Sequence, residues 1–420
     1  MLAAIAASLI SMQLCKPSPS QVAWQDAEVG MFVHFAPNTW QDLEYDNLST
    51  PLSAINPTKL DTDQWARVAK SMGAKYLVFV AKHVGGFCWW QTATTEYSVK
   101  STPWRGGKGD VMADVAKSCK KYGLKLGVYL SPADSKHGIE VGGKAKTPAG
   151  QDSYIKTFRT QLTELLTKYG PIFEVWFDGS LIFDVGDILK KHAPDAIIFQ
   201  GPQATIRWVG NEEGFAPYPC WNAVKSGVHP WGMYTGADGD PEGDRWLPNE
   251  VDCRMRDTWF WNTRNEPSVK PLDKLMEMYE NSVGHGAVLL LNNTPDPTGL
   301  IPAADVKRAA EFGAEIKRRY GAAIADVSGI GPLHVLSPSA PSTIDAVVTM
   351  EDIREGERVR EYAIEGLVDG KWRPLCKGTA IGHKKIDKFE PVKVASVRLR
   401  VLKSVGPPVI RRLAIYHTEV

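Results

Sequence analysis

The chain has 420 residues, a length that favours two domains over one. Hydrophobic residues make up 43% and charged residues 23%, which is typical of a globular protein and excludes a largely disordered chain. The formal net charge is +1 and no basic run appears, so we expect neither nucleic acid nor an acidic membrane surface as a partner. The 14 tryptophans are many for this length. They suit either core filling or stacking on sugar rings, and composition leaves both open.

The first residues resemble part of an export signal. Met1 to Leu14 is an apolar, small-residue stretch, but it lacks the positively charged segment that normally precedes one. We interpret residues 1–20 as a truncated signal or N-terminal segment and expect a secreted or periplasmic protein. The alternative is a short N-terminal helix packed on the fold. No other segment is long and apolar enough to span a bilayer.

The six cysteines are scattered along the chain and have no metal-ligand spacing. Most are expected to be buried thiols that act as small hydrophobic residues. The spacing of the cysteines is also compatible with one or two disulfides.

From residue 29 onward, short apolar runs alternate with amphipathic stretches of helical periodicity. Gly73, Gly123 and Gly170 follow three of the predicted helices, as glycines at helix ends often do. Strands are predicted at 30–35, 76–80, 124–130, 173–177, 196–199 and 287–291, and helices at 62–72, 110–122, 154–169, 185–192, 272–283 and 305–320.

Continuous apolar strands indicate a parallel sheet covered by helices on its faces. So many β–α repeats, with no Gly-x-Gly-x-x-Gly after the first strand, favour a closed barrel over an open dinucleotide-binding sheet. We therefore predict an α/β protein with a TIM-like (β/α) barrel over residues 21–325. The loop-rich stretch 201–270 interrupts the repeat, and such loops on a barrel usually bind substrate.

After about residue 325 the pattern changes to short, partly alternating strands separated by turns. The predicted strands are 347–350, 359–364, 394–399 and 410–416. They indicate an antiparallel β-sandwich of galactose-binding-like type over residues 326–420. With no low-complexity linker between them, the two domains are expected to pack together.

Side chains that follow the strands of a parallel barrel converge on one pocket. Two carboxylates and two histidines among them suit glycoside hydrolysis, in which one carboxylate attacks and a second acts as acid and base. A single histidine at a strand end is more often structural, so the combination carries the argument. A metal-dependent hydrolase is the competing interpretation, but neither His-x-His at the first strand end nor His-Glu-x-x-His is present. The strand-end residues are His34, His83, Asp178, Gln200 and Glu250.

The same residues lie in blocks that resemble a known enzyme family. His34-Phe35-Ala36-Pro37-Asn38-Thr39-Trp40 resembles its motif His-Phe-Gly-Pro-Asn-Thr-Phe, and the segment 81–88 resembles Lys-His-His-Asp-Gly-Phe. Three further blocks are similar, at 175–179, 206–212 and 246–261. The family is the retaining α-L-fucosidases of glycoside hydrolase family 29. The branch most similar in these blocks prefers α-1,3/1,4-linked fucose, and the resemblance covers nearly the whole chain.

The resemblance implies an exo-acting enzyme that releases L-fucose from fucosylated oligosaccharides or glycoconjugates by double displacement. It implies no metal and no other cofactor. Asp178 matches the nucleophile, and Trp176 matches the indole that lines the fucose site. The expected substrate-binding residues, with Trp89 as a further candidate, are His34, Glu44, His83 and Arg207.

The chain departs from the family in two places. Val84 and Gly85 replace the family's second histidine and its aspartate. In the similar branch the acid/base glutamate lies about a dozen residues after the arginine, where this chain has no carboxylate. Glu250 is the first candidate for the acid/base, followed by Glu212 and Glu213. The other interpretation of Glu212 is a loop carboxylate paired with Arg207 or another base.

Two functional alternatives follow from these departures. A related L-sugar such as L-galactose would be accepted if Val84 and Gly85 leave room in the pocket. A carbohydrate-binding relative that has lost catalysis would bind the sugar without hydrolysing it.

Overall fold

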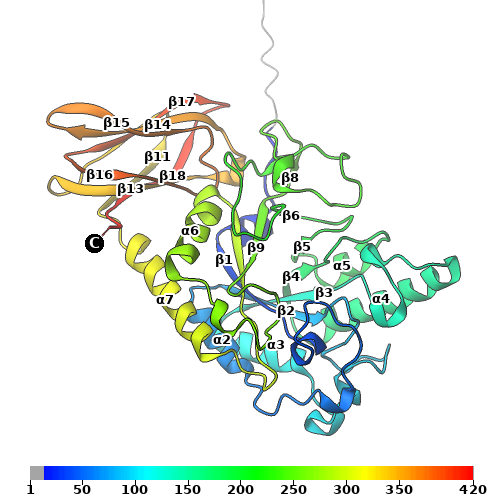
Figure 1. The fold of residues 1–420 in the computed structure, drawn as a ribbon. Coiled ribbons are helices and arrows are strands. Elements are labelled where there is room, and N and C mark those ends of the chain that lie inside the picture. Colours follow the sequence, from blue (N-terminus) through cyan, green and yellow to red (C-terminus); the bar gives the residue numbers. More distant parts are fainter. Residues whose placement is uncertain (1–13, 420) are drawn as a thin grey trace, which may run out of the picture.

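The structure is a computed structural model that describes residues 14–419. Most of the apolar stretch interpreted as a signal therefore lies outside the described residues. The described chain forms a barrel followed by a β-sandwich (Figure 1). No helix in the described range is long and apolar enough to cross a membrane.

Eight parallel strands form the barrel. Their order around it is β5-β4-β3-β2-β1-β10-β9-β6, and a bridge between Phe199 and Ile206 brings the two edges together. The predicted TIM-like α/β fold is thus confirmed, as a nearly closed barrel. The strands are β1 (Val29–Val33), β2 (Tyr76–Lys82), β3 (Lys125–Leu130), β4 (Ile172–Trp176), β5 (Ile197–Phe199), β6 (Arg207–Trp208), β9 (Asn249–Arg254) and β10 (Val288–Asn292).

Helices cover the outside of the barrel. Asp61, Asp110 and Thr147 cap three of them by accepting a hydrogen bond from the first helical turn. The third helix begins at Pro148, earlier than predicted, because Thr147 caps it and proline suits the first helical position. The helices are α2 (Thr62–Ser71), α3 (Val111–Tyr122), α4 (Pro148–Lys168), α5 (Gly186–His192), α6 (Leu272–Ser282) and α7 (Ala303–Tyr320).

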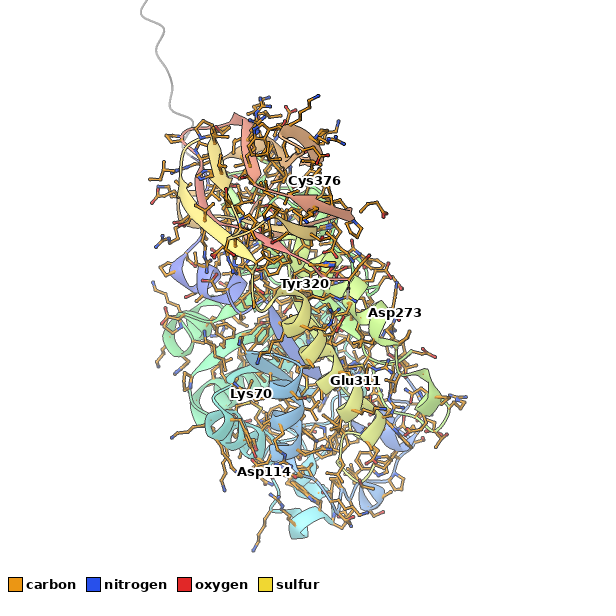
Figure 2. The ribbon with its side chains drawn as sticks, turned by 90° about the vertical axis from the view of Figure 1, so that its left-hand side faces the viewer. Lys70, Asp114, Asp273, Glu311, Tyr320 and Cys376 are labelled. Atoms are coloured by element: carbon orange, nitrogen blue, oxygen red, sulfur yellow. The ribbon has the colours of Figure 1, made fainter. Side chains whose placement is uncertain are left out.

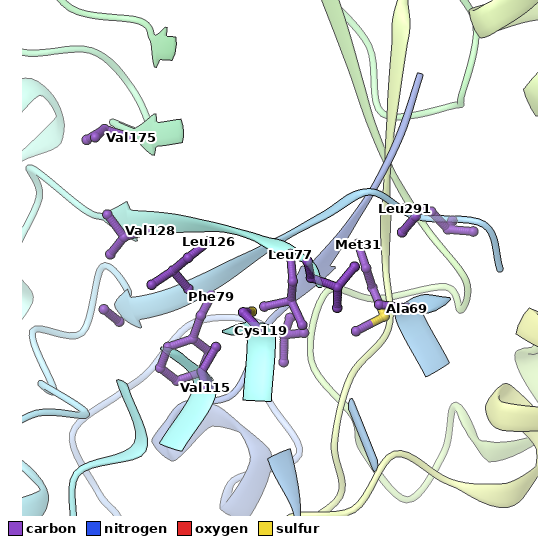
Figure 3. Packing of buried hydrophobic residues seen from close by; sticks show 14 of the residues in the cluster. Met31, Ala69, Leu77, Phe79, Val115, Cys119, Leu126, Val128, Val175 and Leu291 are labelled. Atoms are coloured by element: carbon purple, nitrogen blue, oxygen red, sulfur yellow. The ribbon is translucent and has the colours of Figure 1, made fainter. Parts of the chain in front are cut away.

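Two apolar layers hold the barrel together. The outer layer lies between strands and helices, where Met31, Leu77 and Phe79 pack with Ala69 of α2 and Val115 of α3 (Figure 3). The inner layer fills the barrel interior and is rich in aromatic rings. Its aromatic members include Trp24, Phe32, Tyr76, Tyr129, Trp176 and Phe199.

The short helix α1 (Pro19–Gln25) places Trp24 among the residues of the barrel interior. The Nε2 of Gln21 also donates to the carbonyls of Thr205 and Trp246, at 2.6 and 2.8 Å. The described part of the N-terminal segment is therefore packed on the barrel and forms part of its core.

The stretch 201–270, predicted to be mostly loop, contains four strands. Two of them, β7 (Ala223–Val224) and β8 (Arg245–Trp246), form a small antiparallel pair. The others are β6 and β9, and β9 is a full barrel strand between β6 and β10. The expectation missed β9 because its inward residues are acidic and do not form an apolar run.

The C-terminal domain consists of two four-stranded antiparallel sheets, as predicted. The run 394–399 is not one strand, because a turn at Ala395–Ser396 separates β16 from β17. The strand order is β11-β18-β13-β16 in one sheet of the sandwich and β12-β17-β14-β15 in the other. The strands are β11 (Ala325–Ile330), β12 (Leu333–Leu336), β13 (Ser342–Glu351), β14 (Val359–Val368), β15 (Lys371–Gly378), β16 (Lys385–Val394), β17 (Val397–Ser404) and β18 (Val409–Tyr416).

The two domains pack together at the C-terminal end of α7. Tyr320, at the end of that helix, lies where barrel and sandwich meet (Figure 2), and its ring is 5.7 Å from that of Tyr416. On the barrel side of the junction, Asn222 donates to the buried carboxylate of Glu357. All six cysteines are free thiols, so no disulfide contributes to the fold.

Candidate active site

A polar cavity of about 460 Å³ lies at the carboxyl ends of the barrel strands. Four carboxyl groups and two imidazoles converge on it, together with aromatic rings. The lining residues are Phe32, His34, Glu44, Tyr45, His83, Tyr129, Trp176, Asp178, Glu212, Asp252 and Trp259.

Asp178 lies two residues beyond the end of β4. Tyr129 of β3 donates its hydroxyl hydrogen to Asp178 Oδ2 at 3.0 Å. Burial raises the pKa of Asp178, and the hydrogen bond from Tyr129 opposes that rise. The charge of Glu212 raises the same pKa further, which places the two carboxylates within electrostatic reach of each other. Asp178 is therefore a rigidly held carboxylate at the pocket wall.

His34 follows β1, and its tautomer is set by Asn292 at the end of β10. The Nδ2 of Asn292 donates to the carbonyl of Trp259, so its Oδ1 faces His34 Nδ1 at 2.9 Å. The hydrogen of the neutral ring therefore lies on Nδ1, which leaves Nε2 as an acceptor. Burial, with the neighbouring His83, lowers the pKa of His34 well below its usual value, so the ring is neutral.

His83 follows β2 and stacks on Tyr129, with the ring centres 5.8 Å apart. Burial lowers the pKa of His83 to about 3, so this imidazole is also neutral. Its Nδ1 is buried and has no hydrogen-bond partner among the described residues. Two neutral imidazoles that line one pocket offer hydrogen bonds to hydroxyl groups without adding charge.

Glu44 and Trp259 reach the pocket from two loops that contact each other. The backbone N–H of Trp259 donates to Glu44 Oε1 at 2.9 Å, while Glu44 Oε2 is buried without a donor in the described structure. Burial raises the pKa of Glu44. Glu44 thus has one oxygen fixed by the neighbouring loop and one left for a ligand.

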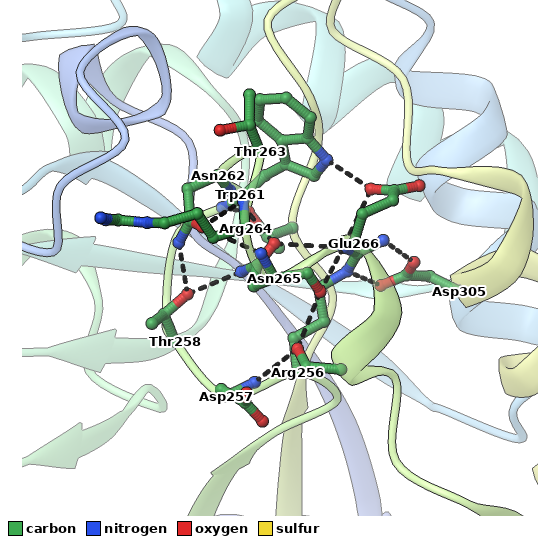
Figure 4. Close-up of polar contacts among 12 residues, drawn as sticks. Arg256, Asp257, Thr258, Trp261, Asn262, Thr263, Arg264, Asn265, Glu266 and Asp305 are labelled. Carbon is green, nitrogen blue, oxygen red and sulfur yellow. Dashed lines mark hydrogen bonds and ion pairs between the residues drawn. The ribbon is translucent and has the colours of Figure 1, made fainter.

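The loop that carries Trp259 is fixed by a buried guanidinium (Figure 4). Arg256 forms an ion pair with Asp305 of α7, and both side chains are fully buried. Arg256 Nη1 also donates to the carbonyl of Asn265 at 2.9 Å and to Glu266 Oε2 at 3.0 Å. This network joins both ends of the loop to α7 and so holds Trp259 in place.

Glu212 lies on the loop after β6 and also lines the pocket. Its side chain is 41% exposed and therefore reaches solvent. The indole N–H of Trp259 donates to Glu212 Oε2 at 3.1 Å, and Arg254 lies 3.4 Å from the same oxygen. The alternative of a loop carboxylate paired with a base is met in part, because the base is Arg254 and not Arg207. Glu212 is therefore a solvent-accessible carboxylate in the same pocket as the half-buried Asp178.

Asp252 is a pocket residue that the sequence reasoning did not select. It is buried, and burial together with nearby Glu250 raises its pKa well above the usual range. A protonated Asp252 can donate a hydrogen bond, and its Oδ1 has no partner among the described residues. The available signal was the two-residue spacing from Glu250, which puts both side chains on one face of a strand.

Glu250 does not line the pocket. It was expected at a strand end, but it is the second residue of β9 and pairs in register with Val288 at the start of β10. It is fully buried in the barrel interior, below the level of Asp252.

Arg207 and Trp89 also lie outside the pocket lining. Arg207 is fully buried, and its guanidinium donates to the backbone carbonyls of Thr235, Asn222, Leu247 and Trp221. Trp89 is fully buried, stacks on Phe35 with ring centres 4.7 Å apart, and donates to the Phe35 carbonyl. Both side chains hold loops together in this structure. Of the expected residues, the pocket brings together His34, Glu44, His83, Trp176, Asp178 and Glu212.

The departure at Gly85 has a structural explanation, whereas its neighbour Val84 lies away from the pocket. Val84 is not among the pocket-lining residues. A Cβ at Gly85 would lie 2.3 Å from Asp46 Oδ2, so the carboxylate of Asp46 fills the space beside this glycine. Tyr97, Gln41 and the backbone of Leu48 donate to Asp46. A neighbouring loop therefore supplies a carboxylate where residue 85 has no side chain.

Comparison with known proteins agrees with a sugar-cleaving site. The α-L-fucosidase family model matches residues 38–320. α-L-Fucosidase 1 of Arabidopsis thaliana is 33% identical, over 95% of this chain and 87% of its own length. A solved structure from Bacteroides thetaiotaomicron superposes with a TM-score of 0.92 at 36% identity, covering 97% of this chain and 100% of the other.

A Ruminococcus gnavus fucosidase of glycoside hydrolase family 29, solved in complex with fucose, superposes with a TM-score of 0.83 at 26% identity. The matched region covers 96% of this chain and 95% of that protein. The family match, the curated relatives and the carboxylate-lined barrel pocket agree, and the chain belongs to the α-L-fucosidases of glycoside hydrolase family 29.

Proposed function

We propose that this protein is an exo-acting α-L-fucosidase that works by a retaining double displacement. Asp178 attacks the anomeric carbon of a terminal L-fucose and forms a fucosyl-enzyme. Glu212 protonates the departing oxygen and then activates the water that releases fucose. The observation that carries the proposal is the presence in one small pocket of two carboxylates in different settings: Asp178 is half-buried and held by Tyr129, and the side chain of Glu212 is 41% exposed.

The environments of the two carboxylates support this division of roles. Asp178 is held by Tyr129 at a strand end, and such rigidity suits a nucleophile. Glu212 is accessible to solvent, and within the described residues it accepts one N–H hydrogen bond, from Trp259, beside its ion pair with Arg254. An acid/base must exchange its proton with water in each cycle, so an accessible side chain suits that role. Glu250 has no access to the pocket, and we therefore place Glu212 ahead of Glu250.

The proposed substrate is a fucosylated oligosaccharide or glycoconjugate, bound by its terminal fucose. Neutral His34 and His83 and the free oxygen of Glu44 serve the sugar hydroxyls, while Phe32 and Trp176 provide apolar contacts for the C6 methyl group. We propose a preference for α-1,3/1,4 linkages, which the resemblance of the motifs supports. A panel of linkage-defined fucosyl oligosaccharides tests it.

Azide rescue distinguishes the two carboxylates. Asp178→Ala and Glu212→Ala should each lose nearly all hydrolysis of an unactivated fucoside. Azide should restore turnover of 4-nitrophenyl α-L-fucoside in Glu212→Ala and give α-fucosyl azide, because the β-linked intermediate still forms. With Asp178→Ala, any azide product should have the β configuration. Near-normal activity of Asp178→Ala, or α-fucosyl azide from it, would overturn the assignment.

The alternatives make different predictions. A non-catalytic relative would bind L-fucose without hydrolysing the activated aryl fucoside. An L-galactoside specificity is not favoured, since Val84 lies outside the pocket lining. We also propose export from the cytoplasm, supported by the apolar composition of residues 1–14, and fractionation of the producing cells tests it.

A further inference from the structure

Two glutamates are buried in the barrel interior, and the proposed reaction uses neither of them. Glu174 of β4 and Glu250 of β9 are both fully buried, yet their side chains are close enough to share a hydrogen bond. Two neighbouring carboxyls without solvent cannot both ionise, so the pair retains at least one proton. Accordingly, burial and the charge of Glu174 raise the pKa of Glu250 well above its usual value, and burial raises that of Glu174 to about 7.

Donors from two elements, α1 and β2, hold the pair. The indole of Trp24 in α1 donates to Glu174 Oε2 at 2.9 Å, and the hydroxyl of Tyr76 in β2 donates to Glu250 Oε1 at 3.0 Å. Tyr76 lies across Gly30 of β1, where a Cβ would be 2.3 Å from its ring. A proton shared between the carboxyls also supplies the donor that Glu174 Oε1 otherwise lacks among the described residues. These contacts form a built polar site inside an aromatic core.

The remaining contact of Glu250 leads to the pocket. The indole N–H of Trp176 donates to Glu250 Oε2 at 2.7 Å. Trp176 is stacked between Phe199 and Tyr129, with ring centres 3.6 and 5.6 Å away. Stacking fixes the plane of an indole but permits rotation and sliding within that plane. The hydrogen bond from its only polar atom is what fixes that remaining freedom.

We propose that Glu250 is a positioning residue: from inside the barrel its carboxyl fixes the indole of Trp176, and thereby the wall of the sugar pocket. The inference rests on the proposed function in taking L-fucose as the ligand. The effect extends one step further, because Tyr129, on which Trp176 stacks, donates to Asp178. Glu250 thus acts through contacts and touches no reacting atom.

Two substitutions with opposite expectations test the proposal. Glu250→Gln keeps an oxygen acceptor at the same reach, whereas Glu250→Asp keeps the acid but withdraws it from the indole. Positioning predicts that Glu250→Gln stays within about threefold of wild type in L-fucose affinity and kcat/KM. Glu250→Asp should lose about tenfold in affinity, the size of one lost hydrogen bond. Isothermal titration calorimetry with L-fucose measures the affinity, and 4-nitrophenyl α-L-fucoside hydrolysis measures turnover.

Tyr76→Phe is the matched control, since it removes the other donor to Glu250 and leaves the Trp176 contact. We expect lower thermal stability with L-fucose affinity within about twofold of wild type. Glu250→Met fills a similar volume without an acceptor, makes the same prediction as Glu250→Asp, and covers the case in which that variant does not fold.

The opposite ranking would overturn the proposal. An acid/base role for Glu250 predicts that Glu250→Asp retains more turnover than Glu250→Gln and that azide restores the latter. Equal L-fucose affinity in all variants would also exclude positioning. Calorimetry measures binding without turnover. If the wild-type protein binds L-fucose but cleaves no fucoside, the proposed function is refuted. The ranking of the variants by L-fucose affinity still tests the role of Glu250 in that case.

Discussion

Tyr129 links the aromatic interior of the barrel to the proposed nucleophile. Its hydroxyl donates to Asp178, and this hydrogen bond lowers the pKa of a carboxyl that burial raises. The donor therefore increases the fraction of Asp178 that is ionised, which is the form able to attack. The burial that holds the Asp178 carboxyl in place also raises its pKa and so disfavours ionisation. The hydrogen bond from Tyr129 offsets part of that rise.

Tyr129→Phe should move the acidic limb of the pH–rate profile to higher pH. The substitution removes the hydrogen bond that stabilises the ionised form, so the pKa of Asp178 rises and activity is lost sooner as pH falls. The acidic limb of kcat/KM for 4-nitrophenyl α-L-fucoside measures this pKa in the free enzyme. Tyr154→Phe, which alters a buried tyrosine bonded to Lys82, is the control and should leave the limb in place. An unshifted limb in Tyr129→Phe would contradict the role.

The strands were predictable wherever both faces are apolar, and β9 shows where that approach fails. Val251 and Cys253 face the outer core, while Glu250 and Asp252 face the barrel interior and read as polar. The motif located Glu250 along the chain, but its depth depends on where the strand begins and on its register with β10. Arg207 and Trp89 illustrate the same limit, because a motif gives no information about which side of a loop a side chain occupies.

At the scale of a loop, Gly85 and Asp46 form one unit. Gly85 does not have a positive φ, so the requirement for glycine there comes from space. Gly85→Asp restores the family's residue but places it on the Asp46 carboxylate. We expect a loss of about 1–3 kcal/mol in the free energy of unfolding from overpacking, and lower kcat/KM because Glu44 and Tyr45 precede Asp46.

The double variant Asp46→Gly/Gly85→Asp exchanges the positions of the carboxylate and should recover much of that stability. Gly85→Ala is the control, since it adds the clashing Cβ without a second charge. Denaturant unfolding of wild type, the single variants Gly85→Asp and Asp46→Gly, and the double variant gives the coupling energy. A double variant destabilised by the sum of the two single effects would show that the two sites are independent.

The barrel and the sandwich were both predictable as classes of fold, but the contacts that join them were not. Those contacts combine apolar packing, in which Val348 and Ile386 of the sandwich join the outer core of the barrel, with isolated polar residues far apart in the sequence, such as Asn222 and Glu357. Asn222 donates to Glu357 through its backbone N–H at 3.0 Å and through Nδ2 at 2.7 Å. Asn222 also follows Trp221, whose carbonyl accepts from Arg207. The sandwich therefore supports the same barrel loops that Arg207 holds together.

The Asn222–Glu357 contact makes the stability of the whole molecule depend on pH. Burial raises the pKa of Glu357 and the donors from Asn222 oppose that rise. With a raised pKa in the folded state, the carboxyl contributes stability that is complete below its ordinary pKa and is lost as pH rises through the folded value. Asn222→Ala removes a donor to the ionised form and should raise the folded pKa further. Its destabilisation should therefore be larger at neutral pH than in the acidic range.

Thermal unfolding of wild type and Asn222→Ala across this pH range measures the difference. In a Glu357→Gln background the residue at 357 no longer titrates, so the effect of Asn222→Ala should become independent of pH. A single transition that shifts as a whole would mean that barrel and sandwich unfold together, because the contact spans both. A pH-dependent difference that persists in the Glu357→Gln background would assign the effect to another group and refute this account of the junction.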